Sequence, residues 1–294
     1  MLTSLRNSTR NFLSNISRTY RTHIYCRRAI KRSKDTTGTV SMVTSNYLNV
    51  DTFPLMLRDW IDFVGRRPYE IVVTDGGTVP DAVDMYRKLF EEGLIDKLFL
   101  MQPKHPENTR KSCFIQEYYA GVMASGDYLL FFRPDTIPYR NGHEDWLREY
   151  IEILAANSRL FSITGSSPGP GYLGEISNKF WCLEHTSENF ALLPRKNHVE
   201  AIALCNDFWC SGWRGTNPFS NIGEVAERCM IESAWDVYCR KKGMHVLMQK
   251  EDDTWSIFHT NARGDNLITL RQRCRLRKGL ESFYNRSGSF LCVE

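Results

Sequence analysis

From residue 39 onward the chain alternates short apolar runs with longer amphipathic segments. The runs are apolar without strict alternation, which is typical of strands covered on both faces. They span residues 39–44, 70–74, 97–101 and 128–132. The segments between them repeat apolar residues every three or four positions, as helices packed on a sheet do. These span residues 52–64, 80–92 and 109–124. The order predicts an α/β fold with a mostly parallel central sheet, flanking helices and right-handed crossovers.

The second half of the chain continues this alternation with longer loops. We expect helices at 144–157 and 196–209, and strands at 161–164 and 244–248. An apolar run at 256–259 ends in a histidine. The whole pattern divides the chain into an N-terminal extension (1–38), a central domain (39–262, with halves 39–139 and 140–262) and a C-terminal extension (263–294).

Polar residues follow the predicted strands directly. The loop at residues 44–47 follows the first strand, Asp75 follows the second, and Arg133 and Asp135 follow the fourth. The period-two spacing of Arg133 and Asp135 points both side chains to one side. Because ligands bind beyond the carboxyl ends of parallel strands, the pattern predicts one site at this sheet edge. A surface ion pair before a loop is the competing interpretation.

Three segments together resemble the nucleotide-binding half of family-two glycosyltransferases with the GT-A fold. They are TVSMVTSNYLN, EIVVTDGGT and ASGDYLLFFRPDTIP, and the resemblance covers roughly residues 39–260. It implies a GT-A type fold that binds a nucleotide-diphosphate sugar. It also implies that Thr44, Asn46, Tyr47 and Asp75 contact the base and ribose.

Arg133 stands where this family has the first Asp of an Asp-x-Asp motif that binds a divalent metal ion. The resemblance implies Mn²⁺ or Mg²⁺ at Asp135, with His259 near the metal or diphosphate, but one carboxylate fewer weakens such a site. A guanidinium stays protonated and donates two parallel hydrogen bonds to phosphate oxygens. We therefore expect Arg133 to take over part of the metal's task, so that metal dependence is weak or absent. The alternative is that Arg133 pairs only with Asp135 and that activity is lost.

Residues 223–240 resemble the Glu-Asp region of the same family, which implies a helix there, and residues 190–195 resemble its acceptor-side strand. Inverting transfer needs a carboxylate that takes the proton of the acceptor hydroxyl. We expect Glu232 to be this base and place Asp236 second; four residues apart, they share a helix face. Ser233 stands where the family has its second acid, and an Asp236–Arg240 pair is the competing interpretation.

The ends of the chain are basic although the middle is acidic. Residues 1–34 hold nine Lys and Arg and no Asp or Glu, whereas the net charge of the chain is only +4. Their apolar spacing predicts an amphipathic helix that lies on an anionic membrane surface. A solvated arm and an organellar transit peptide are the other interpretations. Residues 263–294 predict a second basic helix. Nucleic acid is not expected as a partner, because aromatic and basic residues are not interleaved.

Cysteine usage and the absence of long apolar runs bear on localisation. The nine cysteines are odd in number and form no CxxC pair, which favours reduced thiols and a cytoplasmic protein. The basic tail adds a peripheral place at the membrane. No run reaches the ~18–20 apolar residues of a spanning helix.

We expect an inverting glycosyltransferase that moves a sugar from a nucleotide diphosphate to a glycan or lipid-linked hydroxyl acceptor. A non-catalytic GT-A-like module that binds nucleotide or glycan is the alternative, favoured by Arg133 and Ser233. A Rossmann-like methyltransferase ranks third, because no glycine-rich loop follows the first strand.

Overall fold

The computed structural model describes most of the chain between residues 38 and 277. The described residues are 38–47, 49–76, 79–100, 117, 119–165, 172–204, 231–252 and 254–277. The N-terminal extension up to residue 37, most of the helix predicted at 109–124 and the first part of the helix predicted at 223–240 lie outside them. So does the chain after residue 277. Within the described ranges, no helix is long and apolar enough to cross a membrane.

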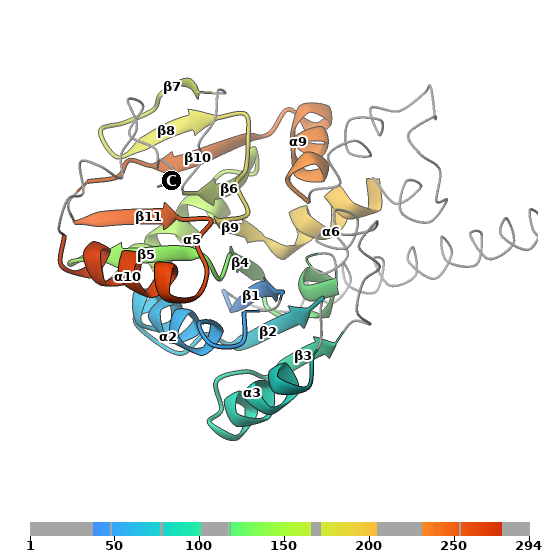
Figure 1. Cartoon of the computed structure of the whole chain (residues 1–294). Helices are drawn as coiled ribbons and strands as arrows, with labels where there is room; N and C mark the ends of the chain where they lie inside the picture. The colour runs from blue at the N-terminus through green and yellow to red at the C-terminus, as the bar shows by residue number, and fades with distance from the viewer. Residues whose placement is uncertain are drawn as a thin grey trace, which may run out of the picture.

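A nine-stranded sheet forms the centre of the described fold (Figure 1). Its strand order is β3-β2-β1-β4-β9-β6-β10-β8-β7. The strands are β1 (Val40–Asn46), β2 (Glu70–Asp75), β3 (Lys97–Leu100), β4 (Tyr128–Phe132), β6 (Leu160–Thr164), β7 (Tyr172–Glu175), β8 (Phe180–Leu183), β9 (Phe190–Pro194) and β10 (His245–Gln249). The predicted strands are therefore confirmed, whereas β7 and β8 were not predicted.

Most strands of this sheet run in one direction. Strand β1 is parallel to β2 and β4, β2 is parallel to β3, and β6 is parallel to β10. Strand β9 is antiparallel to both β4 and β6, and β8 is antiparallel to β10 and β7. Within this sheet, β8 and β9 thus run against the other strands. The predicted α/β class with a mostly parallel central sheet is confirmed.

Helices cover both faces of the sheet, which explains the lack of alternation in the strand sequences. The helices are α2 (Phe53–Val64), α3 (Pro80–Glu91), α5 (Trp146–Ala156), α6 (Arg195–Leu204), α9 (Ile231–Lys242) and α10 (Gly264–Arg275). In β4, Leu130 and Phe132 point into the core under α2, α3 and α5. Leu129 and Phe131 point to the opposite core, under α6 and α9. Both sets are buried, so every position of the strand is apolar.

Helix α2 shows how local sequence fixes an element's limits. A proline occupies its first turn, where the missing N–H has no helical partner to lose. Gly65 ends the helix in a left-handed conformation with φ 81°, and its N–H bonds the carbonyl oxygens of Ile61 and Asp62. Trp60 of α2 is fully buried and donates from Nε1 to the carbonyl oxygen of Thr136, 3.1 Å away, which ties the helix to the segment after β4.

A second, two-stranded sheet lies beside α10. Strands β5 (Thr136–Arg140) and β11 (Trp255–His259) pair antiparallel, with His259 opposite Thr136. Strand β5 was not predicted, because the run after Asp135 is short and contains Pro138. Helix α10 begins within the predicted C-terminal extension and packs Leu267 and Leu270 into a small core with this sheet (Figure 1).

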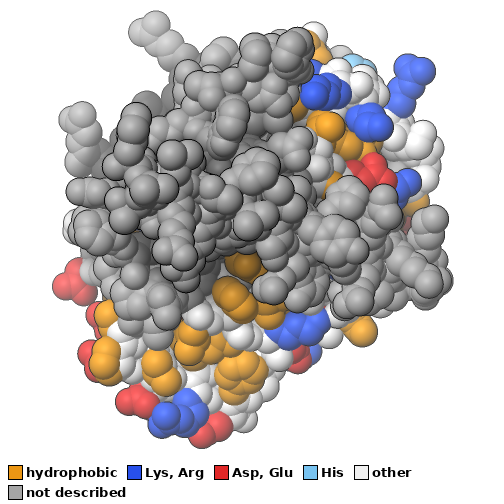
Figure 2. All heavy atoms as spheres, turned by 90° about the vertical axis from the view of Figure 1, so that its right-hand side faces the viewer, with side chains coloured by type: hydrophobic (Ala, Val, Ile, Leu, Met, Phe, Trp, Pro, Cys, Tyr) orange, Lys and Arg blue, Asp and Glu red, His pale blue; other side chains and the backbone are white. Residues whose placement is uncertain are grey.

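Strand β3 ends the order of the main sheet. Figure 2 shows apolar side chains gathered on the lower part of its view, at the height of α3 and β3 in Figure 1. Exposed large hydrophobic residues of this region are Phe90, Leu100 and Tyr119. Tyr119 stacks on Phe99 of β3 at 4.6 Å between ring centroids. Among the described residues, no strand pairs with the outer side of β3.

Candidate functional site

Strand register brings the predicted site residues to one edge of the sheet. Asn46 at the end of β1 lies opposite Asp75 at the end of β2. Thr44 lies opposite Phe132, the last residue of β4, so that Arg133 follows at the same edge. The predicted convergence of these strand ends is confirmed.

A hydrogen-bonded chain of three side chains, which we call the β1–β2 network, lies beyond the first two strands. Asn46 Nδ2 donates to the hydroxyl oxygen of Tyr86 at 2.8 Å, and this hydroxyl donates to Asp75 Oδ2 at 2.5 Å. Burial, followed by the negative charge of Asp75, raises the pKa of Tyr86 well above its ordinary value, so the hydroxyl keeps its proton. Asp75 has no exposed surface. The β1–β2 network is therefore buried. In it an amide donates to a protonated tyrosine hydroxyl, and this hydroxyl donates to one carboxylate.

The other residues predicted to contact nucleotide divide between the interior and the edge. Thr44 is buried, and its hydroxyl donates to the carbonyl oxygen of Phe132 at 2.8 Å. Tyr47 is partly exposed. Tyr86 was not predicted, because in α3 it falls on the same buried face as Met85 and Leu89 and resembles packing. The nucleotide contacts of Thr44, Asn46, Tyr47 and Asp75 stay predictions.

Arg133 pairs with two buried carboxylates. Its Nη2 lies 2.8 Å from Glu117 Oε1 and also contacts Glu188 Oε1. The arginine side chain is 24% exposed, whereas the two glutamates are 4% and 5% exposed. The alternative in which Arg133 pairs only with Asp135 is therefore wrong.

Antiparallel pairing explains how Glu188 reaches Arg133. Strand β9 begins beside the end of β4, with Phe190 opposite Phe132. The backbone N–H of Arg133 accordingly donates to the carbonyl oxygen of Asn189 at 3.3 Å. The residues that precede β9 thus reach the sheet edge from a distant part of the sequence.

Asp135 and His259 form a separate pair beside Arg133. His259 Nε2 lies 3.5 Å from Asp135 Oδ2. Burial alone would raise the pKa of Asp135, but the hydrogen bond and charge of His259, with the charge of Arg133, hold this pKa below its ordinary value. Thr260 fixes the segment by donating from its hydroxyl to the carbonyl oxygen of Asp135 at 2.7 Å. The carboxylate is therefore ionised and points at an imidazole.

The donor set allows a test of the predicted metal. Asp135 and His259 lie together, and one carboxylate oxygen with one imidazole nitrogen suits Mn²⁺ better than Mg²⁺, which prefers oxygen ligands. In the described part of the chain, no group of three His, Cys, Asp or Glu residues is arranged to hold an ion. These residues can supply two protein ligands, and an ion there needs further oxygens from another source, such as a diphosphate.

The predicted acid pair on α9 meets a histidine that the sequence did not single out. His185 Nδ1 lies 2.8 Å from Asp236 Oδ2, and His185 Nε2 lies 3.9 Å from Glu232 Oε2. Glu232 Oε1 also accepts the backbone N–H of Glu188 at 2.8 Å. The structure therefore brings Glu232 and Asp236 to one face of α9, as their spacing predicts, and turns both toward the β8–β9 connection.

Burial raises the pKa of Glu232 to about 7. The nearby charges of His185 and Arg133 lower this pKa, while those of Glu117 and Asp236 raise it further. A carboxyl whose pKa lies near neutrality can take a proton and release it again at physiological pH. We call the six residues Arg133, Glu117, Glu188, Glu232, Asp236 and His185 the β4–α9 cluster.

The β8–β9 connection (residues 184–189) is held against β6 by side-chain hydroxyls. Ser162 and Thr186 share a hydrogen bond of 2.8 Å. Thr164 Oγ1 donates to the carbonyl oxygen of Ser187 at 3.0 Å and lies 3.1 Å from the Ser187 nitrogen, whose N–H it accepts. These bonds satisfy buried backbone groups and fix the residues on either side. The signal in the sequence is the polar run EHTSEN before an apolar strand, which only the antiparallel place of β9 makes meaningful.

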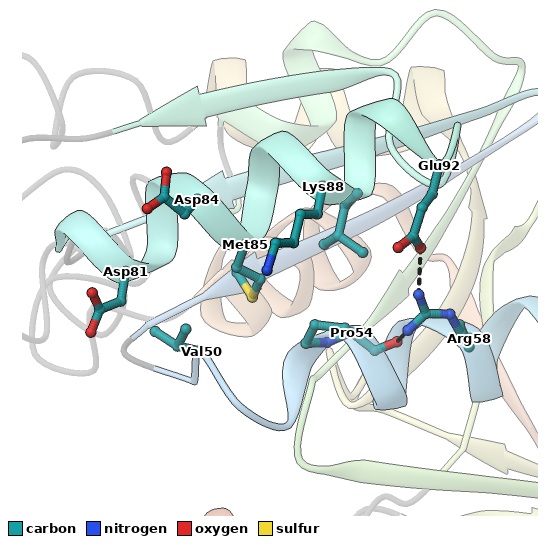
Figure 3. A pocket seen from close by; sticks show the side chains of 9 residues that line it. Val50, Pro54, Arg58, Asp81, Asp84, Met85, Lys88 and Glu92 are labelled. Carbon is teal, nitrogen blue, oxygen red and sulfur yellow. Dashed lines mark hydrogen bonds and ion pairs between the residues drawn. The ribbon is translucent and has the colours of Figure 1, made fainter.

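Two surface hollows lie away from these residues. One, of about 350 Å³, lies between α2 and α3 (Figure 3). Arg58 and Glu92 form an ion pair across it, and Asp81, Asp84 and Lys88 add charge along α3. The other, of about 390 Å³, lies between α2 and β5 beside Arg140 and Arg275. Neither is lined by a residue predicted for the site.

The chain was compared with known proteins. Comparisons by sequence with models of protein families and with curated proteins give no match. Solved structures that are similar to it include the following three. A mannosyltransferase from Pyrobaculum calidifontis, in complex with GDP-Man and Mn²⁺, is 12% identical, with 79% of this chain and 84% of that chain covered and a TM-score of 0.37. TarS 1–349 from S. aureus is 11% identical, with coverages of 74% and 59% and a TM-score of 0.42.

Glucosyl-3-phosphoglycerate synthase from Mycobacterium tuberculosis, in complex with Mn²⁺, UDP and glucosyl-3-phosphoglycerate, is 14% identical with a TM-score of 0.30. The match covers 48% of this chain and 47% of the synthase, so the chain spans about half of that protein's length. At these TM-scores the likenesses do not identify a substrate or a reaction for this chain.

Proposed function

We propose that the protein transfers a sugar from a nucleotide-diphosphate sugar to a hydroxyl acceptor with inversion at the anomeric carbon. The observation that carries the proposal is the carboxyl edge of the sheet. There a buried carboxyl with its pKa near 7, Glu232, shares one cluster with Arg133, whose cation lies beside Asp135 and His259. A base for a hydroxyl and a cationic place for a leaving diphosphate are the two groups that inverting transfer requires.

In this proposal the ionised Glu232 takes the proton from the acceptor hydroxyl. The acceptor oxygen then forms a bond to the anomeric carbon from the side opposite the diphosphate, and the bond from that carbon to the diphosphate oxygen breaks. The diphosphate leaves with the electron pair, near the positive charge of Arg133. Hydrogen-bonded donors aimed at developing negative charge are worth about 2.7–4 kcal/mol each in transition-state stabilisation.

A divalent cation would be held by Asp135 and His259 and would offset the charge of the diphosphate. The β4–α9 cluster holds more carboxylates than cationic side chains, and this negative charge favours a divalent cation nearby. Arg133, already paired with Glu117 and Glu188, has only part of its charge left for a phosphate. We therefore propose that metal strengthens donor binding, while Arg133 supplies a cation that needs no metal.

A non-catalytic module that binds nucleotide or glycan is the second candidate. Two observations favour it: the carboxylates around Arg133 neutralise it, and Asp75 is fully buried. Such a module would bind a nucleotide diphosphate and give no product.

Thermal stabilisation by UDP-, GDP- and TDP-sugars, followed by product analysis, tests the proposal. A ligand present at 100 times its dissociation constant adds about 2.7 kcal/mol to the free energy of unfolding, which a melting curve detects. We expect one nucleotide class to stabilise the protein and to be consumed when a hydroxyl acceptor is added. Stabilisation without hydrolysis or transfer would support the non-catalytic module, and no stabilisation by any donor would contradict both candidates.

Attachment to an anionic membrane surface is a further part of the proposal, supported by the basic, acid-free residues 1–34. Deletion of these residues should abolish sedimentation with vesicles that contain phosphatidylserine and leave the melting curve unchanged. Equal sedimentation of the deleted and full chains would contradict it.

A further inference from the structure

His185 lies between the two carboxylates of α9, although it belongs to a different part of the chain. Its two ring nitrogens face different partners: Nδ1 lies 2.8 Å from Asp236 Oδ2, and Nε2 lies 3.9 Å from Glu232 Oε2. The imidazole therefore connects the proposed base to a second acid, and the transfer scheme above gives it no role.

The position of His185 is fixed by its surroundings. Thr186 and Ser187, the next two residues, are buried and bonded to the hydroxyls of Ser162 and Thr164 in β6. Glu188, three residues on, binds Glu232 through its backbone N–H. The same short connection thus holds both His185 and the carboxyl of Glu232.

Asp236 sets the chemistry of the ring. A carboxylate 2.8 Å from Nδ1 accepts a hydrogen bond from it, so that the neutral imidazole carries its hydrogen on Nδ1 and its lone pair on Nε2. That lone pair lies on the side of Glu232. In the described part of the chain, the other oxygen of Asp236, Oδ1, has no hydrogen-bond partner, so this carboxylate is held by its bond to His185.

We propose that His185 is the positioning residue of Glu232 and receives the proton that Glu232 removes from the acceptor, with Asp236 orienting the imidazole. This inference rests on the proposed function. It adds His185 and Asp236, which together hold the proton, to the proposed base Glu232.

The proposed step conserves protons and charge. The acceptor hydroxyl gives its proton to Glu232 as the new bond to the anomeric carbon forms and the bond to diphosphate breaks. When Glu232 Oε2 and His185 Nε2, 3.9 Å apart in this structure, close to hydrogen-bond distance in the substrate complex, the proton passes from Glu232 to Nε2. This gives an imidazolium whose charge Asp236 offsets. Glu232 is thereby returned to its ionised form, and release of the proton from His185 to solvent completes the cycle.

The charged and hydrogen-bonding groups that face Glu232 come from four parts of the fold. They are His185 and the backbone N–H of Glu188 from the β8–β9 connection, Arg133 after β4, Glu117 from the helical segment before β4, and Asp236 from α9 itself. The charge of Arg133, and the charge of His185 in its protonated form, lower the pKa of Glu232 against the effect of burial. Removal of His185 should therefore raise this pKa, whereas loss of a residue that only packs would not move it in a defined direction.

The test compares His185→Gln, Asp236→Asn and the double variant with the wild type in the full chain. His245→Gln is the matched control, because His245 is exposed at the start of β10, at the opposite end of its strand from the site edge. For His185→Gln we expect kcat at pH 7 to fall about 10- to 100-fold, the usual effect of a misplaced catalytic group, with the donor KM within twofold. The acidic limb of the kcat/KM profile should move to higher pH. The double variant should lose no more of kcat than His185→Gln alone, since Asp236 acts through His185.

A second measurement does not depend on turnover. Because Glu232 has a raised pKa in the folded state, the free energy of unfolding should fall as pH rises from 5 toward 7. In His185→Gln the fall should continue to a higher pH than in the wild type, and His245→Gln should follow the wild type. Wild-type protein that turns over no donor would contradict the proposed function, while this stability measurement would still decide the coupling. An unshifted acidic limb together with an unshifted stability curve in His185→Gln would overturn the inference.

Discussion

The two sides of the sheet edge handle polar groups in opposite ways. The β1–β2 network buries one carboxylate, Asp75, behind a tyrosine hydroxyl that donates to it and an asparagine that donates to the tyrosine. The β4–α9 cluster instead gathers four carboxylates around one arginine and one histidine. The first arrangement satisfies a single charge with neutral donors, and the second leaves acids in excess over permanent cations.

This difference indicates which of the two regions can exchange protons during a reaction. Buried polar groups that are hydrogen-bonded to one another, as in the β1–β2 network, hold a fixed shape. Burial disfavours the ionised form of a carboxyl and neighbouring acids add to this effect, so that one acid of such a cluster keeps a proton to near neutral pH. In the β4–α9 cluster that acid is Glu232, with a pKa of about 7. We therefore expect substitutions in the cluster to change catalysis and pH dependence, and substitutions in the network to change binding and packing.

The largest effect should follow from Glu232→Gln. An amide cannot take the acceptor's proton, and a general base contributes about 10²- to 10⁴-fold to rate. We expect kcat to fall by that factor, with donor affinity unchanged by calorimetry. Glu200→Gln is the matched control, because Glu200 bonds Tyr238 of the same helix α9 but lies outside the cluster. A rate within threefold of the wild type would remove Glu232 as the base.

Arg133→Ala should give the largest loss of stability. Breaking a buried ion pair by removing one partner costs about 3–5 kcal/mol, because the remaining charge stays buried. Since Arg133 is 24% exposed, we expect the lower end of this range or less in urea unfolding. Adding Glu188→Gln to Arg133→Ala should recover part of the loss. A double variant less stable than Arg133→Ala alone would show that the Glu188 carboxylate is held by something other than Arg133.

Turnover in excess chelator addresses the other role proposed for Arg133. If its cation neutralises the leaving diphosphate, activity should persist without metal, and Arg133→Asp should make activity respond to Mn²⁺ or Mg²⁺ through paired carboxylates. Wild-type activity that stops in chelator would assign the diphosphate charge to an ion at Asp135 and His259 and not to Arg133.

The proton held by Glu232 gives a smaller effect with a definite sign. Its pKa is raised on folding, so the unfolded chain loses this proton first, and stability falls as pH rises from the ordinary carboxyl pKa toward 7. Glu232→Gln removes this penalty and keeps an oxygen for the Glu188 N–H. The variant should therefore be more stable than the wild type at pH 8 and nearly equal to it at pH 5. Equal destabilisation at both pH values would contradict the raised pKa.

The sequence predicted one side of this comparison better than the other. Apolar runs such as residues 128–132 predicted the parallel strands, and the polar residues at their ends predicted a site at the carboxyl edge of the sheet. Both predictions follow from the local spacing of apolar residues. Glu232 and Asp236 were placed on one face for the same reason. His185 and Glu188 were not predicted, since they meet Arg133 and α9 only through the antiparallel insertion of β9 between β4 and β6. Glu117 was not predicted either, because it reaches Arg133 from the helical segment before β4. Such contacts depend on tertiary pairing that no sequence period records.

The smallest expected effect comes from the β1–β2 network, where Asp75→Asn keeps the shape and removes the charge. A hydrogen bond to a charged group contributes about 1.5–3 kcal/mol and one between neutral groups about 0.5–1.5 kcal/mol. If Asp75 also accepts a hydrogen bond from a nucleobase, nucleotide affinity should fall by about 1 kcal/mol, roughly fivefold, in calorimetry. Tyr86→Phe separates this contact from packing, because it removes the hydroxyl that Asp75 accepts from but leaves the carboxylate in place. We expect Tyr86→Phe to lower stability and to leave nucleotide affinity the same or higher. Unchanged affinity in Asp75→Asn, with lower stability in both variants, would make the network a purely structural support for the ends of β1 and β2.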